Sequence, residues 1–213
     1  MASEWVSVEG IIGAGKTTLL KRLGSIPGAT MIPEPVEKFQ ENGLLAKSYE
    51  NPKEYAFPAQ CHFFTSRINE FEQRFNNEKG AINVSERSPF TDKLFAEINM
   101  TDPDIKSCYL GMWKRWQDFM PKNMRNPTLF IYLRPTLETC MKRANERGRA
   151  EDKDVPIEYQ RRLMEEHDKA FGTGLVKMPD GTFVPCITVA TDEEIETVFI
   201  NLSTRANANR SNA

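Results

Sequence analysis

One stretch near the N-terminus constrains this chain more than any other. Residues 10–18 read GIIGAGKTT and fit the pattern Gly-x-x-x-x-Gly-Lys-Ser/Thr. An apolar segment at 5–8 precedes the stretch, and residues 17–23 follow it with the pattern of a helix. A glycine-rich turn between a strand and a helix lets backbone N–H groups and the helix N-terminus converge on a phosphate. We therefore predict a loop that holds the phosphates of ATP.

Residues of this loop have separate predicted roles. Lys16 is expected to bridge the outer phosphates, and the Thr17 hydroxyl is expected to hold Mg²⁺. The alternative is a glycine-rich turn with a solvated lysine. It does not explain why the turn lies between a predicted strand and a predicted helix. The other predicted ATP contacts in the loop are Gly10, Gly13, Ala14, Gly15 and Thr18.

Length and composition limit the class of protein. The chain has 213 residues and a net charge of −2, which fits one α/β domain and gives no sign of nucleic acid as a partner. Its four cysteines and two histidines are scattered, so neither a disulfide framework nor a zinc site is expected. The first predicted strand begins almost at once, and no apolar run is long enough to span a membrane. We therefore expect a soluble cytoplasmic protein without a membrane partner.

Predicted strands alternate with predicted helices along the chain, which is typical of a parallel sheet with helices on both faces. Five strands are expected, at residues 5–8, 29–32, 81–85, 128–133 and 186–190. Helices are expected at 17–23, 51–76, 89–98, 103–120, 135–147 and 156–171 and from 191 onwards, with an irregular segment at 172–183. We predict a single domain over residues 1–203 and a disordered tail at 204–213.

Two carboxylates are expected where strands end, which is where ligands bind in open parallel sheets. Glu34 stands between two prolines after the second strand, where a carboxylate can accept the proton of an alcohol acceptor. Glu86 ends the third strand, where it can hold Mg²⁺ opposite Thr17, and Arg87 beside it can bind a phosphate. An exposed glutamate and a surface ion pair remain open as alternatives.

Arg143, Arg147 and Arg149 lie at the end of a predicted helix and in the loop after it, within residues 143–155. Arginines on a closing loop suit the charge of a transferring phosphoryl group, so this segment is a candidate lid. Arginine is also common at helix C-termini for electrostatic reasons alone, and the pattern by itself favours that reading.

Together these motifs resemble those of the deoxynucleoside kinase family, which includes deoxycytidine, deoxyguanosine and insect-type multisubstrate kinases. The resemblance covers nearly the whole chain, with the motifs in the family's order. The motifs are the glycine loop, Glu34-Pro35-Val36, Tyr49 and Pro52 followed by Gln60 and Arg67, Glu86-Arg87-Ser88, and the three arginines followed by Pro156 and Tyr159. The resemblance implies a P-loop kinase with an arginine-rich lid, ATP-dependent phosphorylation of the 5′-hydroxyl of deoxynucleosides in nucleotide salvage, and a homodimer.

The resemblance also implies roles for site residues. Glu34 would be the base for the 5′-hydroxyl, with Arg87 beside it. Tyr49, aided by an acid of the lid, would bind the 3′-hydroxyl, and Gln60 would pair with the nucleobase. Arg147 and Arg149 would act on the phosphates, with Arg143 and Arg147 at the nucleotide. The other implied substrate contacts are Phe39, Phe63, Phe64, Arg67, Asp92, Asp152 and Tyr159.

The base preference rests on Arg67 and Asp92. They match a charged pair of the deoxycytidine and deoxyguanosine kinases, whereas thymidine-preferring members carry smaller or apolar residues. We therefore expect deoxyadenosine, deoxyguanosine or deoxycytidine to be favoured over thymidine. The order among them stays open because the chain departs from the family pattern in three places. Asp152 stands where the lid acid is usually Glu, although Glu151 could take that role. Phe39 stands in place of Trp, and Phe63 stands in place of a small residue.

Other functions remain as alternatives. A nucleoside monophosphate kinase would need further cationic residues for the acceptor phosphate, and a base at Glu34 argues against it. A thymidine-accepting kinase of broad specificity stays open. A catalytically inactive, kinase-like subunit is disfavoured because Lys16, Glu34, Glu86 and Arg87 are all present.

Overall fold

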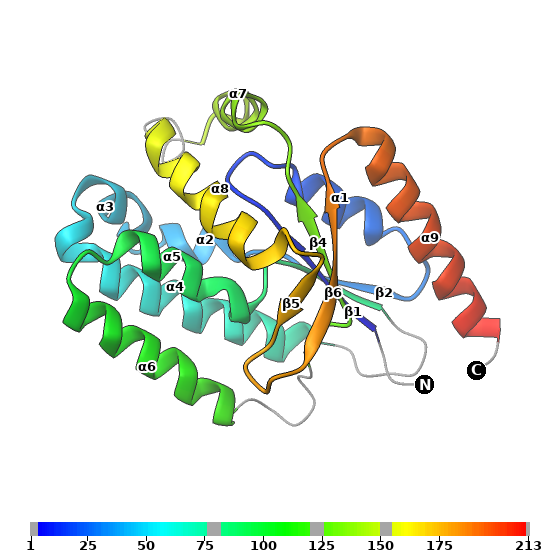
Figure 1. Ribbon diagram of the computed structural model, residues 1–213, viewed down its shortest axis with the longest axis horizontal. Helices are drawn as coiled ribbons and strands as arrows, with labels where there is room; N and C mark the ends of the chain where they lie inside the picture. The colour runs from blue at the N-terminus through cyan, green and yellow to red at the C-terminus, as the bar shows by residue number, and fades with distance from the viewer. Residues whose placement is uncertain (1–3, 76–81, 120–125, 150–154, 212–213) are drawn as a thin grey trace.

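The computed structural model describes residues 4–75, 82–119, 126–149 and 155–211. A six-stranded sheet in the order β2-β3-β1-β4-β6-β5 lies at its centre, with helices on both faces (Figure 1). The strands are β1 Glu4–Glu9, β2 Ala29–Ile32, β3 Ile82–Glu86, β4 Leu129–Leu133, β5 Leu175–Lys177 and β6 Phe183–Val189. The predicted α/β class with a mostly parallel sheet is confirmed, and the predicted number of strands is wrong.

The additional strand, β5, pairs antiparallel with β6, whereas the other pairings in the sheet are parallel. It falls in the segment predicted to be irregular. The Met178 N–H donates to the Thr182 carbonyl at 2.8 Å, and the Asp180 side chain accepts from the Thr182 N–H at 2.9 Å. This turn reverses the chain and brings the short strand against β6. Three residues are too few to show a strand pattern in sequence.

The helices match most of the predicted segments, and α2, α3 and the division of 89–98 into η1 and α5 were not predicted. They are α1 Lys16–Leu23, α2 Val36–Gln40, α3 Leu44–Glu50, α4 Pro52–Arg74, the 3₁₀ helix η1 Pro89–Thr91, α5 Asp92–Asn99, α6 Pro103–Phe119, α7 Leu137–Arg147, α8 Ile157–Phe171 and α9 Asp192–Ser211. Figure 1 shows α1 and α9 on one face of the sheet and α4, α5, α6 and α8 on the other. In the part of the chain described here, no helix has the length and apolarity that crossing a bilayer requires.

Within the predicted disordered tail, residues 204–211 are helical, because α9 continues through Ser211, and residues 212–213 lie outside the described residues. Leu202 and Ala206 are buried in the core cluster beneath this helix, and Arg205 pairs with Glu4 of β1 at 3.0 Å. Val198, Leu202 and Ala206 form an apolar stripe along α9, and only Ala206 lies within the polar tail. Burial of that stripe against the sheet offsets the entropy lost on ordering the segment.

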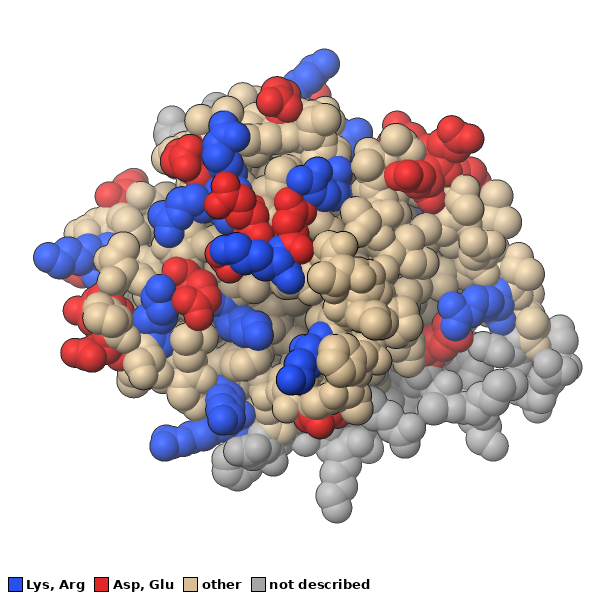
Figure 2. Space-filling view, in the orientation of Figure 1, with Lys and Arg blue, Asp and Glu red and all other residues tan. Residues whose placement is uncertain are grey.

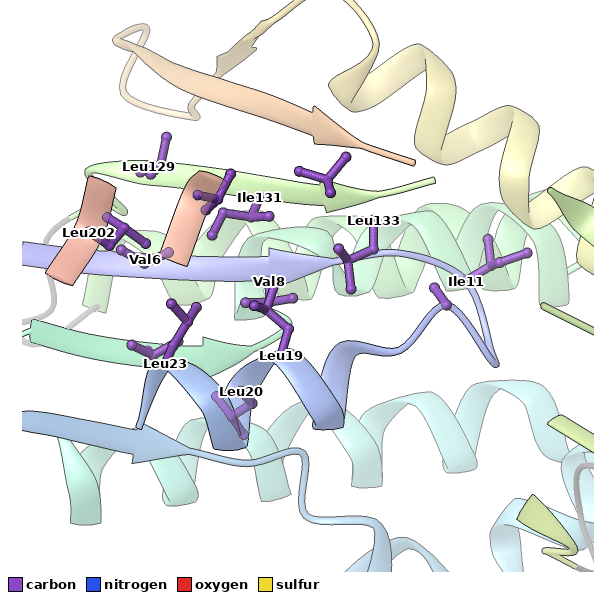
Figure 3. Close-up of a cluster of buried hydrophobic side chains, with 14 of the residues drawn as sticks. Val6, Val8, Ile11, Leu19, Leu20, Leu23, Leu129, Ile131, Leu133 and Leu202 are labelled. Carbon is purple, nitrogen blue, oxygen red and sulfur yellow. The ribbon is translucent and has the colours of Figure 1, made fainter. Parts of the chain in front are cut away.

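The core has two layers because the central strand is covered on both faces. Val6 and Val8 of β1 pack with Leu19 and Leu23 of α1 on one face (Figure 3). Trp5 joins an aromatic cluster on the opposite face. Successive side chains of a strand point to opposite faces, so burial on both sides gives the continuous apolar run seen in the sequence.

The strand order determines where the site forms. β1 lies between β3 and β4, and β2 lies next to β3. In the parallel register Val8 is paired with Glu86, and Ile32 is paired with Ser85. The chain therefore leaves β1, β2 and β3 at one edge of the sheet, where the glycine loop, Glu34 and Glu86 meet.

Candidate active site

The glycine loop has a backbone that only glycine tolerates at certain positions. Gly13 has a φ of 80°, and a Cβ there would overlap the backbone carbonyl oxygen of Cys140 in α7. Gly15 has a φ of 99° and precedes α1, whose first turn receives no side-chain cap. The first N–H groups of α1 thus point to an open site with a favourable helix dipole, as anion binding requires.

Lys16 is held under the loop. Its Nζ donates to the carbonyl oxygen of Ile11 at 2.9 Å, and only 6% of the residue is exposed. Burial, and then the charge of Arg87, lowers the pKa of Lys16 to about 8. A buried ammonium with a single neutral partner is well placed to gain from an anion in the loop.

Thr17 and Glu86 are in direct contact across the ends of α1 and β3. The Thr17 hydroxyl donates to the Glu86 carboxylate, with distances of 2.9 and 3.1 Å to its two oxygens. No cluster of three or more His, Cys, Asp or Glu side chains that could hold a metal occurs among the described residues. A hydroxyl beside a single carboxylate fits Mg²⁺ that takes its remaining oxygens from phosphate and water.

Glu34 lies between two arginines. Its Oε1 is 3.0 Å from Arg67 Nη2 and 3.2 Å from Arg87 Nε. Burial alone would raise the pKa of this carboxyl, but the charges of Arg87 and Arg67 outweigh burial and hold its pKa at about 2. The exposed-glutamate alternative is excluded by this geometry, and Glu34 is ionised at any working pH.

Arg87 is fixed by its backbone and by its neighbours. Its φ of 65° is unusual for a residue other than glycine, and its N–H donates to the Val8 carbonyl at 2.9 Å. The guanidinium carbon lies 4.5 Å from the centre of the Phe95 ring, and Nη1 donates to His167 Nε2 at 3.4 Å. These contacts direct the arginine towards Glu34, so a surface ion pair is not its role.

His167 was not recognised from the sequence, where it appeared isolated. It is fully buried, and its Nδ1 donates to the Leu163 carbonyl at 2.8 Å, which leaves Nε2 as the acceptor from Arg87. Burial, and then the charge of Arg87, lowers the pKa of His167 to about 3. The imidazole is therefore neutral, and it positions Arg87 without competing for anions.

This pKa shift predicts a pH effect on stability. In the unfolded chain His167 becomes protonated below pH ~6.5, whereas in the folded state it becomes protonated only near pH 3. Stability is therefore lost as the pH falls through this window, by about 2 kcal/mol between pH 7 and pH 5. His167→Gln keeps an acceptor and lacks the ionisation. In urea unfolding at both pH values, the wild type should lose about 2 kcal/mol more than this variant. Equal pH dependence of the two proteins would contradict the prediction.

Two further buried side chains were missed in the sequence. Glu9 ends β1 just before the glycine loop; its Oε1 accepts from the Ser7 hydroxyl at 2.8 Å, and burial raises its pKa to about 7. Gln160 of α8 donates from Nε2 to the carbonyl oxygen of Ile12 at 3.0 Å. Gln160 thus holds the backbone of the loop, whereas Glu9 is held by Ser7 and Thr91 at the end of β1. Neither belongs to a motif that could have revealed it.

Two cavities meet at the loop. The inner cavity lies deep between α2, α3, α4 and α5, and the phosphate-loop cavity lies between α1 and α7. Both are lined by Lys16, Glu86, Arg147 and Arg149. The other predicted residues of the inner cavity are Glu34, Phe39, Tyr49, Gln60, Phe63, Arg67, Arg87, Asp92 and Tyr159, and those of the phosphate-loop cavity are Gly13, Gly15, Thr17, Thr18 and Arg143.

Three of the predicted site residues that the structure describes do not line these cavities: Gly10, Ala14 and Phe64. Gly10 is buried at the start of the loop, where a Cβ would lie 2.7 Å from the Leu133 carbonyl oxygen. Phe64 is 2% exposed and packs on Trp116 with ring centres 5.1 Å apart, because one residue of helical rotation carries it from Phe63 towards α6. The side chain of Ala14 packs in the core. Asp152, like the alternative lid acid Glu151, lies outside the described residues.

The far end of the inner cavity holds a hydrogen-bonded polar group. Asp92 accepts from Arg67 Nε at 2.9 Å through Oδ2 and from Gln60 Nε2 at 3.1 Å through Oδ1. Arg67 thus connects this end of the cavity to Glu34. The rings of Phe39 and Phe63, with centres 4.5 Å apart, form an aromatic wall beside it.

A phosphate loop, a cluster of arginines and a buried carboxylate between two joined cavities define a phosphoryl-transfer enzyme with a separate acceptor site. A family model described as deoxynucleoside kinase matches residues 6–207. The chain belongs to the deoxynucleoside kinase family, and it is an enzyme that phosphorylates nucleosides for salvage.

Similar proteins differ in the bases that their names specify. A probable deoxycytidine kinase of Fowlpox virus is 35% identical over 169 residues, covering 77% of this chain and 70% of that protein. A thymidine kinase of Ictalurid herpesvirus 1 is 34% identical over 171 residues, covering 76% and 71%. The structure of a deoxyadenosine kinase from M. mycoides has the same fold, with a TM-score of 0.74 at 21% identity over 96% of this chain and 98% of that chain.

Proposed function

We propose that this enzyme transfers the γ-phosphoryl group of ATP to the 5′-hydroxyl of a deoxynucleoside bound in the inner cavity. The observation that carries the proposal is the place of Glu34, an ionised carboxylate in a cavity that shares Lys16, Glu86, Arg147 and Arg149 with the phosphate-loop cavity. A hydroxyl between Glu34 and the loop would be in line with the outer phosphate.

In this reaction the 5′-oxygen forms a bond to phosphorus while the bond from phosphorus to the leaving oxygen of ADP breaks. Glu34 takes the proton of the hydroxyl, and Arg87 and Lys16 face the charge on the transferring group. Arg147 and Arg149 approach the same point from the end of α7. Thr17 and Glu86 would hold Mg²⁺, which supplies charge neutralisation between the phosphates when it is bound.

A nucleoside suits the inner cavity better than a nucleoside monophosphate. The two arginines nearest to Glu34 are already paired with it, and Arg67 is also paired with Asp92. A second phosphate would need cations that are not neutralised in this way. Phosphoryl transfer to a panel of deoxynucleosides and their monophosphates tests the proposal, and transfer to the monophosphates alone would overturn it.

The base preference that we propose is deoxyadenosine, deoxyguanosine or deoxycytidine over thymidine. Asp92 can accept from an exocyclic amine, and Arg67 can donate to a ring nitrogen or keto oxygen. Thymine places a methyl group at this edge, so that the buried pair loses a hydrogen-bonding partner. Such a loss can discriminate by as much as ~10⁴-fold in favourable sites.

The double substitution Arg67→Met with Asp92→Ala tests this preference. We expect kcat/KM for thymidine to rise at least about tenfold relative to deoxycytidine, because the unpaired polar groups that penalise the methyl group are gone. Steady-state kinetics with all four deoxynucleosides measures the change. Asn69→Met with Glu97→Ala, on exposed positions of the same two helices, is the matched control. Thymidine as the best substrate of the unmodified enzyme would refute the proposal.

We further propose a cytoplasmic homodimer. All four cysteines, Cys61, Cys108, Cys140 and Cys186, are free thiols, which suits a reducing compartment. The outer side of α6 exposes 41% of Ile105, and Met112 and Trp116 are half-buried on this helix. An apolar helix face of this kind is typical of a subunit interface. Sedimentation velocity measures the oligomeric state, and a monomer at micromolar concentration would contradict the proposal.

A further inference from the structure

A large cavity that is open to solvent on one side lies on the opposite side of α5 from the inner cavity. It has a volume of about 620 Å³ and is lined by η1, α5, α6, β4, the end of α8 and the β5–β6 hairpin. This volume is within the range of small-molecule sites, roughly 300–1,000 Å³. Among the described residues, none that lines it also lines the inner cavity or the phosphate-loop cavity. It is therefore a separate site, called here the lysine-rimmed cavity.

The walls of this cavity are aromatic and rigid. Phe130 and Phe171 at its floor are fully buried, and Phe90 and Trp113 are less than 10% exposed. Trp113 Nε1 donates to the Pro89 carbonyl at 2.9 Å, so the indole cannot easily turn to fill the space. These walls suit a flat or chain-like apolar body.

The mouth of the cavity is apolar as well. Phe183 is 61% exposed and Leu175 is 52% exposed, and both belong to the lining. Together with the aromatic walls, these two side chains extend the apolar surface from the cavity to its opening, and contiguous apolar surface of this kind is typical of binding sites. An occupant that covers them would bury this surface and gain the corresponding free energy.

The rim is basic. The lining includes four lysines, Lys93, Lys114, Lys169 and Lys177, and no carboxylate among the described residues. Figure 2 shows blue side chains on the face where β5 and α6 lie in Figure 1. Lys93 Nζ stands 5.3 Å from the centre of the Trp113 ring, which places this ammonium directly at the aromatic wall. Lys169 has a partner, Glu166, at 2.6 Å, so the excess charge comes mainly from the other three.

The sign of the charge at the rim limits the ligand. An acidic head group would neutralise the lysines. A cationic or neutral ligand would leave the lysines without a counter-charge, and so the chemistry of the rim favours one sign of charge.

We propose that the lysine-rimmed cavity binds a small amphipathic anion, with an aromatic or alkyl body against Phe90, Trp113, Phe130 and Phe171 and a carboxylate, sulfonate or phosphate at the lysines. The two sites share one wall. Thr91 and Lys93 line the lysine-rimmed cavity, and Asp92 between them lines the inner cavity. The site is thus adjacent to the base-recognition group without being part of it.

The test uses the full-length protein and the fluorescent aromatic sulfonate 1-anilinonaphthalene-8-sulfonate. The kinase site is first saturated with deoxynucleoside and a non-hydrolysable ATP analogue, so that the probe cannot bind there. We expect one saturable site per chain under these conditions. Loss of probe binding when the kinase site is occupied would overturn the proposal.

Two variants locate the bound probe. Lys114→Glu with Lys177→Glu reverses the rim charge and should weaken binding at least about tenfold, equivalent to 1.4 kcal/mol. Val176→Trp fills the cavity from the hairpin and should abolish binding. Lys53→Glu with Lys142→Glu carries the same change of net charge on exposed lysines elsewhere, and binding should stay within about twofold of the parent.

Kinase activity and urea midpoints of all variants show whether the fold is intact. If Val176→Trp is unfolded, the surface pair of lysine substitutions decides alone. Probe binding that is indifferent to the rim reversal would show that the sulfonate is held elsewhere and would refute the proposal.

Discussion

Lys16→Ala is expected to reduce phosphoryl transfer by at least about 10³-fold while the protein remains folded. The ammonium is the cation held within the glycine loop itself, between the N-terminus of α1 and the cavity shared with the acceptor. Removal of a preorganised charge at a transferring phosphoryl group typically lowers the rate by a factor of this order. Because burial already lowers the pKa of Lys16, its removal should not destabilise the fold.

Single-turnover and steady-state kinetics with saturating ATP measure the loss. Lys142→Ala is the matched control, because Lys142 is an exposed lysine of α7 that lines neither cavity of the site. We expect that control to keep its kcat within a few-fold of the parent. A similar retention of kcat by Lys16→Ala would show that Lys16 is outside the reaction centre.

The second large effect is expected for Glu34→Gln, which should lower kcat by about 10²–10⁴, the usual range for the loss of a general base. The amide has nearly the same size, so nucleoside KM should change only a few-fold. Since Arg87 and Arg67 hold the pKa of Glu34 at about 2, this carboxylate stays ionised throughout the working range. The kcat of the parent enzyme should therefore show no acidic limb from Glu34 between about pH 5 and 9.

Glu37→Gln is the control for this substitution. Glu37 is exposed and lies three residues further along the chain, in α2. Unchanged turnover in Glu34→Gln at neutral pH would remove Glu34 from the role of base. A loss of nucleoside binding together with the loss of kcat would instead indicate that Arg67 and Arg87 repel each other once their shared counter-charge is gone. Measurement of the nucleoside dissociation constant distinguishes the two outcomes.

Short-range patterns gave most of the elements. The glycine loop, the apolar strands and the alternation with helices predicted the sheet class, because these signals lie within stretches of about ten residues. The predicted start of the last helix was also correct, and a reciprocal cap fixes it: the Glu194 N–H donates to Thr191 Oγ1 at 3.2 Å, and Glu194 Oε2 accepts from the Thr191 N–H at 3.1 Å. The predicted last helix ends too early and the strand β5 was missed, because both features depend on packing against distant segments.

The sequence by itself determined the phosphate loop, the two strand-end carboxylates and the family, because each is a run of residues whose types and spacing carry the chemistry. Only the tertiary structure decided how these charges combine. The pairing of Glu34 with both Arg67 and Arg87, the support of Arg87 by His167 and the burial of Phe64 in the core arise between segments far apart in the chain. Ionisation and burial depend on the surrounding charges and dielectric, and these are properties of the packed molecule that spacing along a chain does not record.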